Sequence, residues 1–201
     1  MKPEPSLAGV ASMGALFGCS SGEPSAVAMA ATGDGGAQGG SAAVAPKYVF
    51  LSIGDGMSYP QIQATAYFNG AQQSGEEPTI ERVSFMDSPV IGSQCTYDST
   101  SFCPDSASTA TSIASGRKTA SGVINVSPDA SERFETIAEK LKRQLGYKVG
   151  VLTSMNLNHA TPAAFYAHQQ SRKNYYEIGQ ELIASGFDYF AGGGLDRKSV
   201  V

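Results

Sequence analysis

Five polar residues have the types and surroundings that chemistry on an anion requires. Asp55 lies between two glycines, which let the backbone turn and bring an acidic group close to a ligand. Ser106 stands at the expected start of a small-residue helix, where free N–H groups and the helix dipole favour a nucleophilic alkoxide or a bound phosphate. His159 and Thr161 are two apart and could face one metal ion, and Arg172 offers the planar fork that clamps phosphate.

Each of these residues also has a purely structural explanation. A Gly-Asp-Gly segment is ordinary turn chemistry, and Asp105 or Ser106 could simply cap a helix. His159 could be a loop histidine with satisfied hydrogen bonds, and Arg172 a solvated surface residue. Taken one at a time, these residues therefore leave both interpretations open.

Hydrophobic patterning predicts the elements that must position these side chains. Strands are predicted over 48–53, 148–153 and 187–191, with a looser strand signal over 83–97. The first two are predicted to be buried on both faces. Helices are predicted over 60–68, over 106–115 stopped by Gly116, from 131 to Gly146, and over about 174–185. Alternating strands and helices indicate an α/β fold with a parallel sheet, whose ligand lies beyond the carboxyl ends of the strands.

Three blocks, in this order, resemble the amino-terminal half of the alkaline phosphatase family. They are Ile53-Gly-Asp-Gly-Met57, then Pro104-Asp-Ser-Ala-Ser-Thr-Ala-Thr111, then Thr153-Ser154 with His159-Ala-Thr-Pro-Ala163. The Asp-Ser-Ala motif is the specific part, and the resemblance covers roughly residues 47–194. It implies a three-layer αβα sandwich around a mostly parallel sheet, incomplete in this chain.

The resemblance also implies a metal site. The family uses a pair of zinc ions and a magnesium ion. By this match Ser106 and Asp55 would bind zinc, Asp55 would also bind magnesium, and His159 and Thr161 would bind magnesium or its waters. Some family members have Asp where His159 stands, which leaves the metal preference of that third site open.

The implied reaction is hydrolysis of small phosphate monoesters. Ser106 would attack phosphorus and form a phosphoserine, while Arg172 holds two phosphate oxygens and Asp105 orients Arg172. His168 matches no ligand of the family. Two alternatives stay open: a phosphodiesterase or sulfatase of the same superfamily, and a non-catalytic surface module that binds phosphate without turnover.

The sequence before residue 47 is typical of a targeting segment. Residues 1–19 resemble a signal peptide of the lipoprotein type, with Cys19 as the lipidated residue, or an ordinary cleaved signal. Residues 20–46 are small and polar and are expected to be a disordered tether. The protein is then expected in the periplasm or at the cell surface, with membrane contact only through the lipid. In such an oxidising compartment Cys95 and Cys103 could form a disulfide, or remain two buried thiols.

Net charge and composition argue against two other classes of protein, nucleic-acid binders and membrane-spanning proteins. The formal net charge is −4 and only 14 residues are Lys or Arg, so a nucleic-acid binder is not expected. Apolar residues make up 41% of the chain, and no apolar run reaches the length of a membrane span. Attraction of a phosphate ester must then come from metals and Arg172 rather than from net charge.

The carboxyl-terminal end bears on activity. Residues 47–195 fit the family, whereas residues 196–201 do not, and they are expected to be an artefactual tail. The family's remaining zinc and magnesium ligands would follow further along, and this sequence has only two His. The chain as written is therefore expected to be inactive, and the full-length protein is expected to be a homodimer, as in the family.

Overall fold

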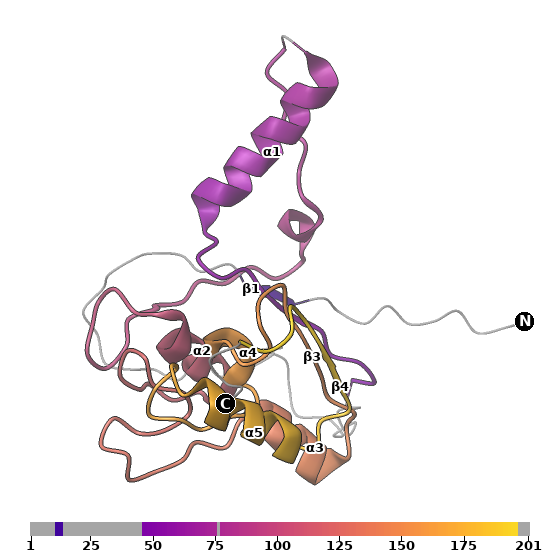
Figure 1. The fold of residues 1–201 in the computed structure, drawn as a ribbon. Coiled ribbons are helices and arrows are strands. Elements are labelled where there is room, and N and C mark those ends of the chain that lie inside the picture. The colour runs from indigo at the N-terminus through magenta and orange to yellow at the C-terminus, as the bar shows by residue number, and fades with distance from the viewer. Residues whose placement is uncertain (1–10, 14–45, 76, 197–201) are drawn as a thin grey trace, which may run out of the picture. The chain divides into compact units, whose positions relative to one another are not determined.

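The structure, a computed structural model, describes residues 11–13, 46–75 and 77–196. It divides the chain into two units, Met1–Cys95 and Thr96–Val201, each of which is described by itself (Figure 1).

The first unit contains a parallel strand pair and one long helix. Strand β1, Ala11–Met13, pairs in parallel with β2, Leu51–Ile53. Helix α1 follows at Tyr59–Ser74 and the short 3₁₀ helix η1 at Ser84–Asp87. Pro60 stands in the first turn of α1, where its missing N–H costs no hydrogen bond. The predicted strand at 48–53 and helix at 60–68 are thus confirmed, with a shorter strand and a longer helix.

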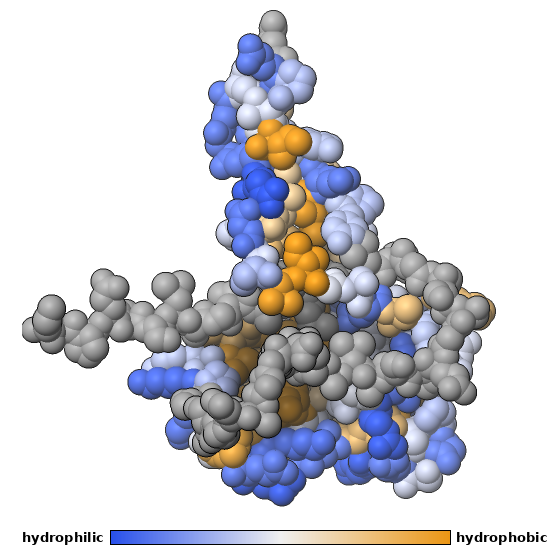
Figure 2. Space-filling model, turned by 180° about the vertical axis from the view of Figure 1, so that it is seen from behind, coloured by the Kyte–Doolittle hydropathy of each residue, from blue (hydrophilic) through white to orange (hydrophobic). Residues whose placement is uncertain are grey.

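One face of α1 packs on the chain segment that follows it. Ile62, Ala66 and Gly70 are the buried residues of the helix, and the carbonyl of Ala66 accepts the N–H of Glu81 at 3.0 Å. Phe68 on α1 is 63% exposed. Figure 2 shows hydrophobic residues exposed along this part of the first unit.

The looser strand signal over 83–97 is wrong. In this range the structure has η1 and irregular chain, and Val90 and Ile91 are 82% and 75% exposed. Pro89 removes a backbone donor and Gly92 weakens an extended segment, so the apolar pair between them has poor conditions for joining a sheet.

The second unit contains two parallel strands connected through helices, and two further helices that precede them in the chain. Its elements are α2 (Ser106–Ser115), α3 (Ile137–Leu145), β3 (Gly150–Leu152), α4 (Ala160–Ala163), α5 (Tyr175–Ala184) and β4 (Tyr189–Ala191). β3 and β4 are parallel, with Val151 opposite Phe190. This arrangement confirms the predicted α/β class, with parallel strands joined through helices.

A core of small residues fills the space between the helices. Alanines of α2 pack against those of α4 and of the residues that follow α4, with Ile124, Tyr166 and Ile178 completing the cluster. Phe187 and Phe190 stack at 6.1 Å on the side of β4. Because the helices meet through alanine methyl groups, their backbones approach closely.

Helix α3 begins later than the sequence pattern predicts. It starts at Ile137 rather than at 131, because Thr136 caps it: the Thr136 hydroxyl accepts the N–H of Glu139 at 3.2 Å, and the Glu139 carboxylate accepts the N–H of Thr136 at 2.8 Å. Phe134, which falls within the predicted helix, is buried in the segment before α3. The predicted end at Gly146 is confirmed by its left-handed φ of 66°.

Two-sided burial of the first two predicted strands is also wrong. In β3 only Val151 is buried, while Leu152 is 70% exposed, and Leu51 of β2 is 41% exposed. Within the described residues each strand has a single partner, so its other edge is unpaired.

Most of the predicted amino-terminal targeting segment lies outside the described residues. Within 1–19 only β1 is described, and Cys19 and nearly all of 20–46 and 196–201 are not. The signal peptide, the lipid, the tether and the tail therefore stay predictions. In the described part of the chain, no helix is both long and apolar enough to cross a bilayer.

Candidate functional site

The amino-terminal end of α2 is the centre of the candidate site. Asp105 adopts an extended conformation and its carboxylate accepts the N–H of Ser108 at 3.0 Å, which caps the helix. Ser106 is the first residue of the helix and is half-buried. α2 ends at Gly116 with a φ of 71°, as predicted. The hydroxyl of Ser106 therefore lies in the first turn of a ten-residue helix, where the dipole favours negative charge.

Arg172 lies at this helix end. Its Nη1 donates to Oδ2 of Asp105 at 2.9 Å, and its Nη2 lies 3.3 Å from Nε2 of His159. A guanidinium has no acceptor, so Nε2 of His159 accepts this hydrogen bond. The backbone N–H of Arg172 donates to the carbonyl of Gly122 at 2.7 Å. The structure thus brings together three residues singled out in the sequence, Asp105, His159 and Arg172, from distant positions along the chain.

Asp105 carries a full negative charge at neutral pH. Burial would raise the pKa of its carboxyl, but N–H groups of Gly122 and Ser108 and the Arg172 guanidinium donate to it and lower the pKa to about 2. The ion pair with Arg172 is mostly shielded from water, with side chains 27% and 24% exposed. Arg172 is therefore held by a permanent anion.

A set of residues that support Asp105 was missed at the sequence level. The hydroxyl of Ser108 lies 3.0 Å from Oδ1 of Asp105 and 3.0 Å from Oδ2 of Asp98. Gly122 donates its N–H to Oδ1 of Asp105 at 3.0 Å, and the preceding Ser121 donates to Asp98. The Asp98-Ser-Thr-Ser101 segment carries an Asx-turn signal. No local pattern indicates that it lies beside Asp105.

His159 ends the loop that follows β3, as predicted, whereas Thr161 lies inside the short helix α4 rather than in that loop. His159 is the residue before the helix, in an extended conformation, and Thr161 is its second residue. Both are half-buried. The short helix forms because Pro162 is tolerated in a first turn and the flanking alanines favour helix.

Asp55 belongs to the other unit. It is exposed, in the turn after β2, where the N–H of Met57 donates to the carbonyl of Gly54 at 3.1 Å and Gly56 has a φ of 71°. The positive φ explains the glycine after Asp55. The position at a strand's carboxyl end agrees with the prediction.

The described residues fit a metal only in part. Asp55, His159, Thr161 and Ser106 offer carboxylate, imidazole and hydroxyl donors, which suit magnesium and zinc. However, no group of three or more His, Cys, Asp or Glu residues gathers among residues 46–75 and 77–196. In addition, Nε2 of His159 faces the Arg172 guanidinium. The chemical types of these donors therefore suit such ions, but the described residues do not gather into a metal site.

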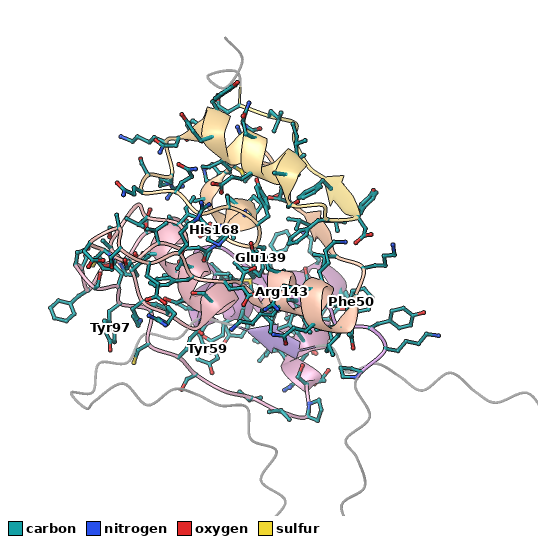
Figure 3. All side chains as sticks on the ribbon, turned by 90° about the horizontal axis from the view of Figure 1, so that it is seen from below. Phe50, Tyr59, Tyr97, Glu139, Arg143 and His168 are labelled. Atoms are coloured by element: carbon teal, nitrogen blue, oxygen red, sulfur yellow. The ribbon has the colours of Figure 1, made fainter. Side chains whose placement is uncertain are left out.

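His168 serves the packing of α3 rather than the candidate site. Its Nε2 lies 2.9 Å from the carbonyl of Phe134 and 3.5 Å from Oε2 of Glu139, and Figure 3 shows His168 beside Glu139. Cys95 and Cys103 are exposed in the structure, in different units and without a disulfide between them. Burial of these two thiols, one of the two expectations, is therefore wrong, and the disulfide stays a prediction.

Comparisons with known proteins point in one direction. A sequence profile of the family "Alkaline phosphatase" matches residues 46–190. Alkaline phosphatase 4 of Bacillus subtilis (strain 168) is 32% identical over 137 residues, which cover 67% of this chain and 29% of that protein. This chain thus spans less than a third of the length of that relative.

Solved structures agree with the sequence comparisons. The cold-active alkaline phosphatase of the psychrophile Shewanella sp. is 34% identical with a TM-score of 0.63, covering 74% of this chain and 36% of that one. A histidine-to-aspartate variant of TAB5 alkaline phosphatase, with Mg bound in its M3 site, is 30% identical with a TM-score of 0.54, covering 65% and 36%.

The fold and the helix-end site define an α/β protein with a serine, an arginine and a carboxylate at the start of one helix. The chain belongs to the alkaline phosphatase family.

Proposed function

We propose that this chain forms the nucleophile-bearing part of a phosphate monoester hydrolase. The observation that carries the proposal is the juxtaposition of Arg172 with Asp105, the residue that caps the helix beginning at Ser106. Family membership supports phosphate monoesters as the substrate class.

The proposed binding step uses charge and hydrogen bonds of the second unit. Arg172 binds two oxygens of the phosphoryl group through its planar fork, and Asp105 holds the guanidinium through Nη1. N–H groups in the first turn of α2 add donors for the same anion. His159, which accepts from Nη2 of Arg172, limits rotation of the guanidinium.

The proposed chemical step occurs at Oγ of Ser106. Its oxygen forms a bond to phosphorus as the bond to the ester oxygen breaks. The alkoxide leaves with the electron pair and takes up a proton from solvent as the alcohol, while the serine proton passes to solvent. Water then attacks phosphorus, the Ser106 oxygen leaves and regains a proton, and inorganic phosphate is released. Arg172 and the helix end stabilise the charge that spreads over the phosphoryl oxygens.

Divalent cations would be held partly by Asp55, Ser106, His159 and Thr161. When bound, zinc and magnesium lower the pKa of a hydroxyl or water and neutralise phosphoryl charge. A TAB5 variant carries Mg in its M3 site, which supports magnesium as one of the ions. Since no three-ligand cluster occurs in the described residues, we propose that the 201-residue polypeptide has negligible turnover by itself.

Phosphate binding by the 201-residue chain is the first test. Titration with inorganic phosphate should show weak binding that Arg172→Ala abolishes. Arg143→Ala is the matched control, because Arg143 pairs with Glu135 on the surface of α3. Binding that survives Arg172→Ala would contradict the proposal.

The covalent step needs a second test on the protein expressed from the whole gene. After acid quenching during turnover of a chromogenic phosphomonoester with zinc and magnesium, mass spectrometry should find phosphate on Ser106. Ser106→Ala should remove both the phosphoserine and the turnover. Ser112→Ala is the control: Ser112 lies further along α2, away from its first turn, and this variant should retain both. Phosphate binding without any phosphoserine would favour the non-catalytic module, and faster diester than monoester hydrolysis would favour a phosphodiesterase.

The cellular setting is proposed on the amino-terminal sequence alone. The lipoprotein-type signal at 1–19 with Cys19 supports a periplasmic or surface location, and homodimerisation is proposed by analogy with the family. Labelling with a lipid precursor, compared between the natural chain and Cys19→Ala, tests the anchor.

A further inference from the structure

Asp98 is a buried carboxylate that accepts more hydrogen bonds than the closure of a turn requires. The residue is 5% exposed. Its Oδ1 accepts the N–H of Thr100 at 2.8 Å, the Thr100 hydroxyl at 2.9 Å and the N–H of Ser101 at 2.7 Å. Its Oδ2 accepts from the hydroxyls of Ser108 and Ser121. All five donors are neutral, so the buried negative charge of Asp98 is stabilised by amide and hydroxyl groups alone.

The two contacts at Oδ2 lead directly to Asp105. Ser108 is fully buried, and its Oγ lies 3.0 Å from Asp98 and 3.0 Å from Oδ1 of Asp105. A serine hydroxyl has one proton, so the two carboxylates share it. The single hydroxyl therefore couples the position of one carboxylate to that of the other.

The second contact fixes the other donor of Asp105. Ser121, held by Asp98, precedes Gly122, whose N–H donates to Oδ1 of Asp105 at 3.0 Å. The carbonyl of the same Gly122 accepts the backbone N–H of Arg172 at 2.7 Å. Asp98 thus restrains the turn that touches both partners of the Asp105–Arg172 pair.

We propose that Asp98 is a positioning residue of the phosphate site: through Ser108 and Ser121 it orients Asp105 and thereby aims the Arg172 guanidinium. This inference rests on the proposed function for its consequence, phosphate binding. Its structural half, the restraint of Arg172, stands on the contacts alone. The alternative is a purely structural role, in which Asp98 only stabilises the 98–101 turn.

The test compares four variants of the 201-residue chain at one fixed pH. Asp98→Ala removes all acceptors. Asp98→Asn keeps Oδ1, and its amide can donate to the oxygens of Ser108 and Ser121. Ser121→Ala removes one link to Gly122. Asp129→Asn is the matched control, because the exposed Asp129 carboxylate likewise accepts serine hydroxyls, from Ser127 at 2.6 Å and Ser131 at 2.8 Å.

Two readouts separate positioning from stability. Hindered rotation of the Arg172 guanidinium, seen by nitrogen NMR of its side-chain N–H groups, reports whether Asp105 holds it. Titration with inorganic phosphate reports the consequence. Asp98→Ala should free the guanidinium and weaken phosphate binding by about tenfold or more, as expected when a charge-assisted hydrogen bond loses its geometry. Ser121→Ala should show a smaller loss, Asp98→Asn should retain most of both, and Asp129→Asn should change neither.

Each outcome decides one question. If Asp98→Ala lowers the melting temperature while guanidinium rotation and phosphate affinity stay as in the natural chain, the role is structural and the proposal is overturned. If Asp98→Ala does not fold, unchanged rotation and affinity in Ser121→Ala overturn it instead. If the natural chain binds no phosphate but Asp98→Ala frees Arg172, positioning stands and the proposed function fails.

Discussion

Single side chains of this protein perform structural and chemical tasks within a few ångströms of each other. Asp105 caps α2 and holds Arg172 with the same carboxylate. Glu139 similarly caps α3 and lies beside His168. Because Asp105 has two tasks, its substitution should change both the stability of α2 and the position of Arg172, and experiments must measure the two separately.

Asn125 shows what one buried residue contributes to stability. It is fully buried with a φ of 47°, and its Nδ2 donates to the carbonyls of Ala164 at 2.7 Å and Ala167 at 2.9 Å. Asn125→Ala should lower the free energy of unfolding by about 3 kcal/mol, because two buried carbonyls lose their donor and alanine is strained at positive φ.

Chemical denaturation of the second unit measures this effect. Asn125→Gly is the control: it loses the same donor but accepts the φ, so it should be about 1 kcal/mol more stable than the alanine variant. Equal stability of the alanine variant and the natural chain would contradict the assignment.

At the scale of elements, capping residues decide where helices begin and end. The boundaries of α2 could be predicted from the sequence, because Asp105 and Gly116 are strong local signals and the structure uses both. The start of α3 could also have been found from the Thr136-x-x-Glu139 capping box, but the apolar Phe134 extended the pattern backwards. The contacts of Asp98 with Ser108 and Ser121 could not, because they depend on tertiary packing.

The capping box of α3 should make stability depend on pH. Burial raises the pKa of Glu139, but His168 and the N–H of Thr136 outweigh it, so the pKa lies below its ordinary value of 4.5. Its stabilisation is then fully present above the ordinary pKa and is lost as pH falls through the lowered one. Glu139→Gln keeps an acceptor for the N–H of Thr136 but loses the negative charge in the first turn of α3 and its attraction to His168. It should therefore be less stable by about 0.5–1 kcal/mol at pH 7 and should approach the natural chain under acid conditions.

Thermal unfolding across this pH range checks the sign. Glu135→Gln is the control, because Glu135 pairs with Arg143 at the more exposed surface of the same helix region. A difference between Glu139→Gln and the natural chain that grows as pH falls would refute the capping role.

Gly70 and Gly179 make a matched pair within two helices. A Cβ at Gly70 of α1 would lie 1.9 Å from the backbone carbonyl oxygen of Thr79, whereas at Gly179 of α5 it would meet nothing within 4 Å. Gly70→Ala should therefore destabilise the first unit, and Gly179→Ala should stabilise the second by about 0.5–1 kcal/mol. Hydrogen exchange of the two helices distinguishes these effects, and slower exchange of α1 in Gly70→Ala would contradict the packing described.

At the scale of the whole molecule, the residues that could be predicted were those with motif-level signals. Ser106, His159 and Arg172 were singled out by residue type and position, and Asp105 by the family resemblance. Asp105, His159 and Arg172 meet in the structure. Burial of the strands could not be predicted, because a run of β-branched residues says how a strand packs in a complete sheet. It does not say how many neighbours the described strands have.

Metal removal should leave the stability of the 201-residue chain unchanged. No cluster of three ligands occurs in its described ranges, so we expect no bound ion to stabilise these ranges. Melting curves with chelator, with zinc and with magnesium should superimpose to within experimental error. A rise of several degrees with zinc would show that residues of this chain complete a site by themselves.

The alanine contact between α2 and α4 has one more consequence. Alanine has no side-chain torsion, so the alanines of this contact have no rotamers that could rearrange. The helix that carries Ser106 is thus supported mainly by side chains that cannot change rotamer. Directed evolution of substrate preference should accordingly find few acceptable changes along this seam and collect its gains in the loops around it.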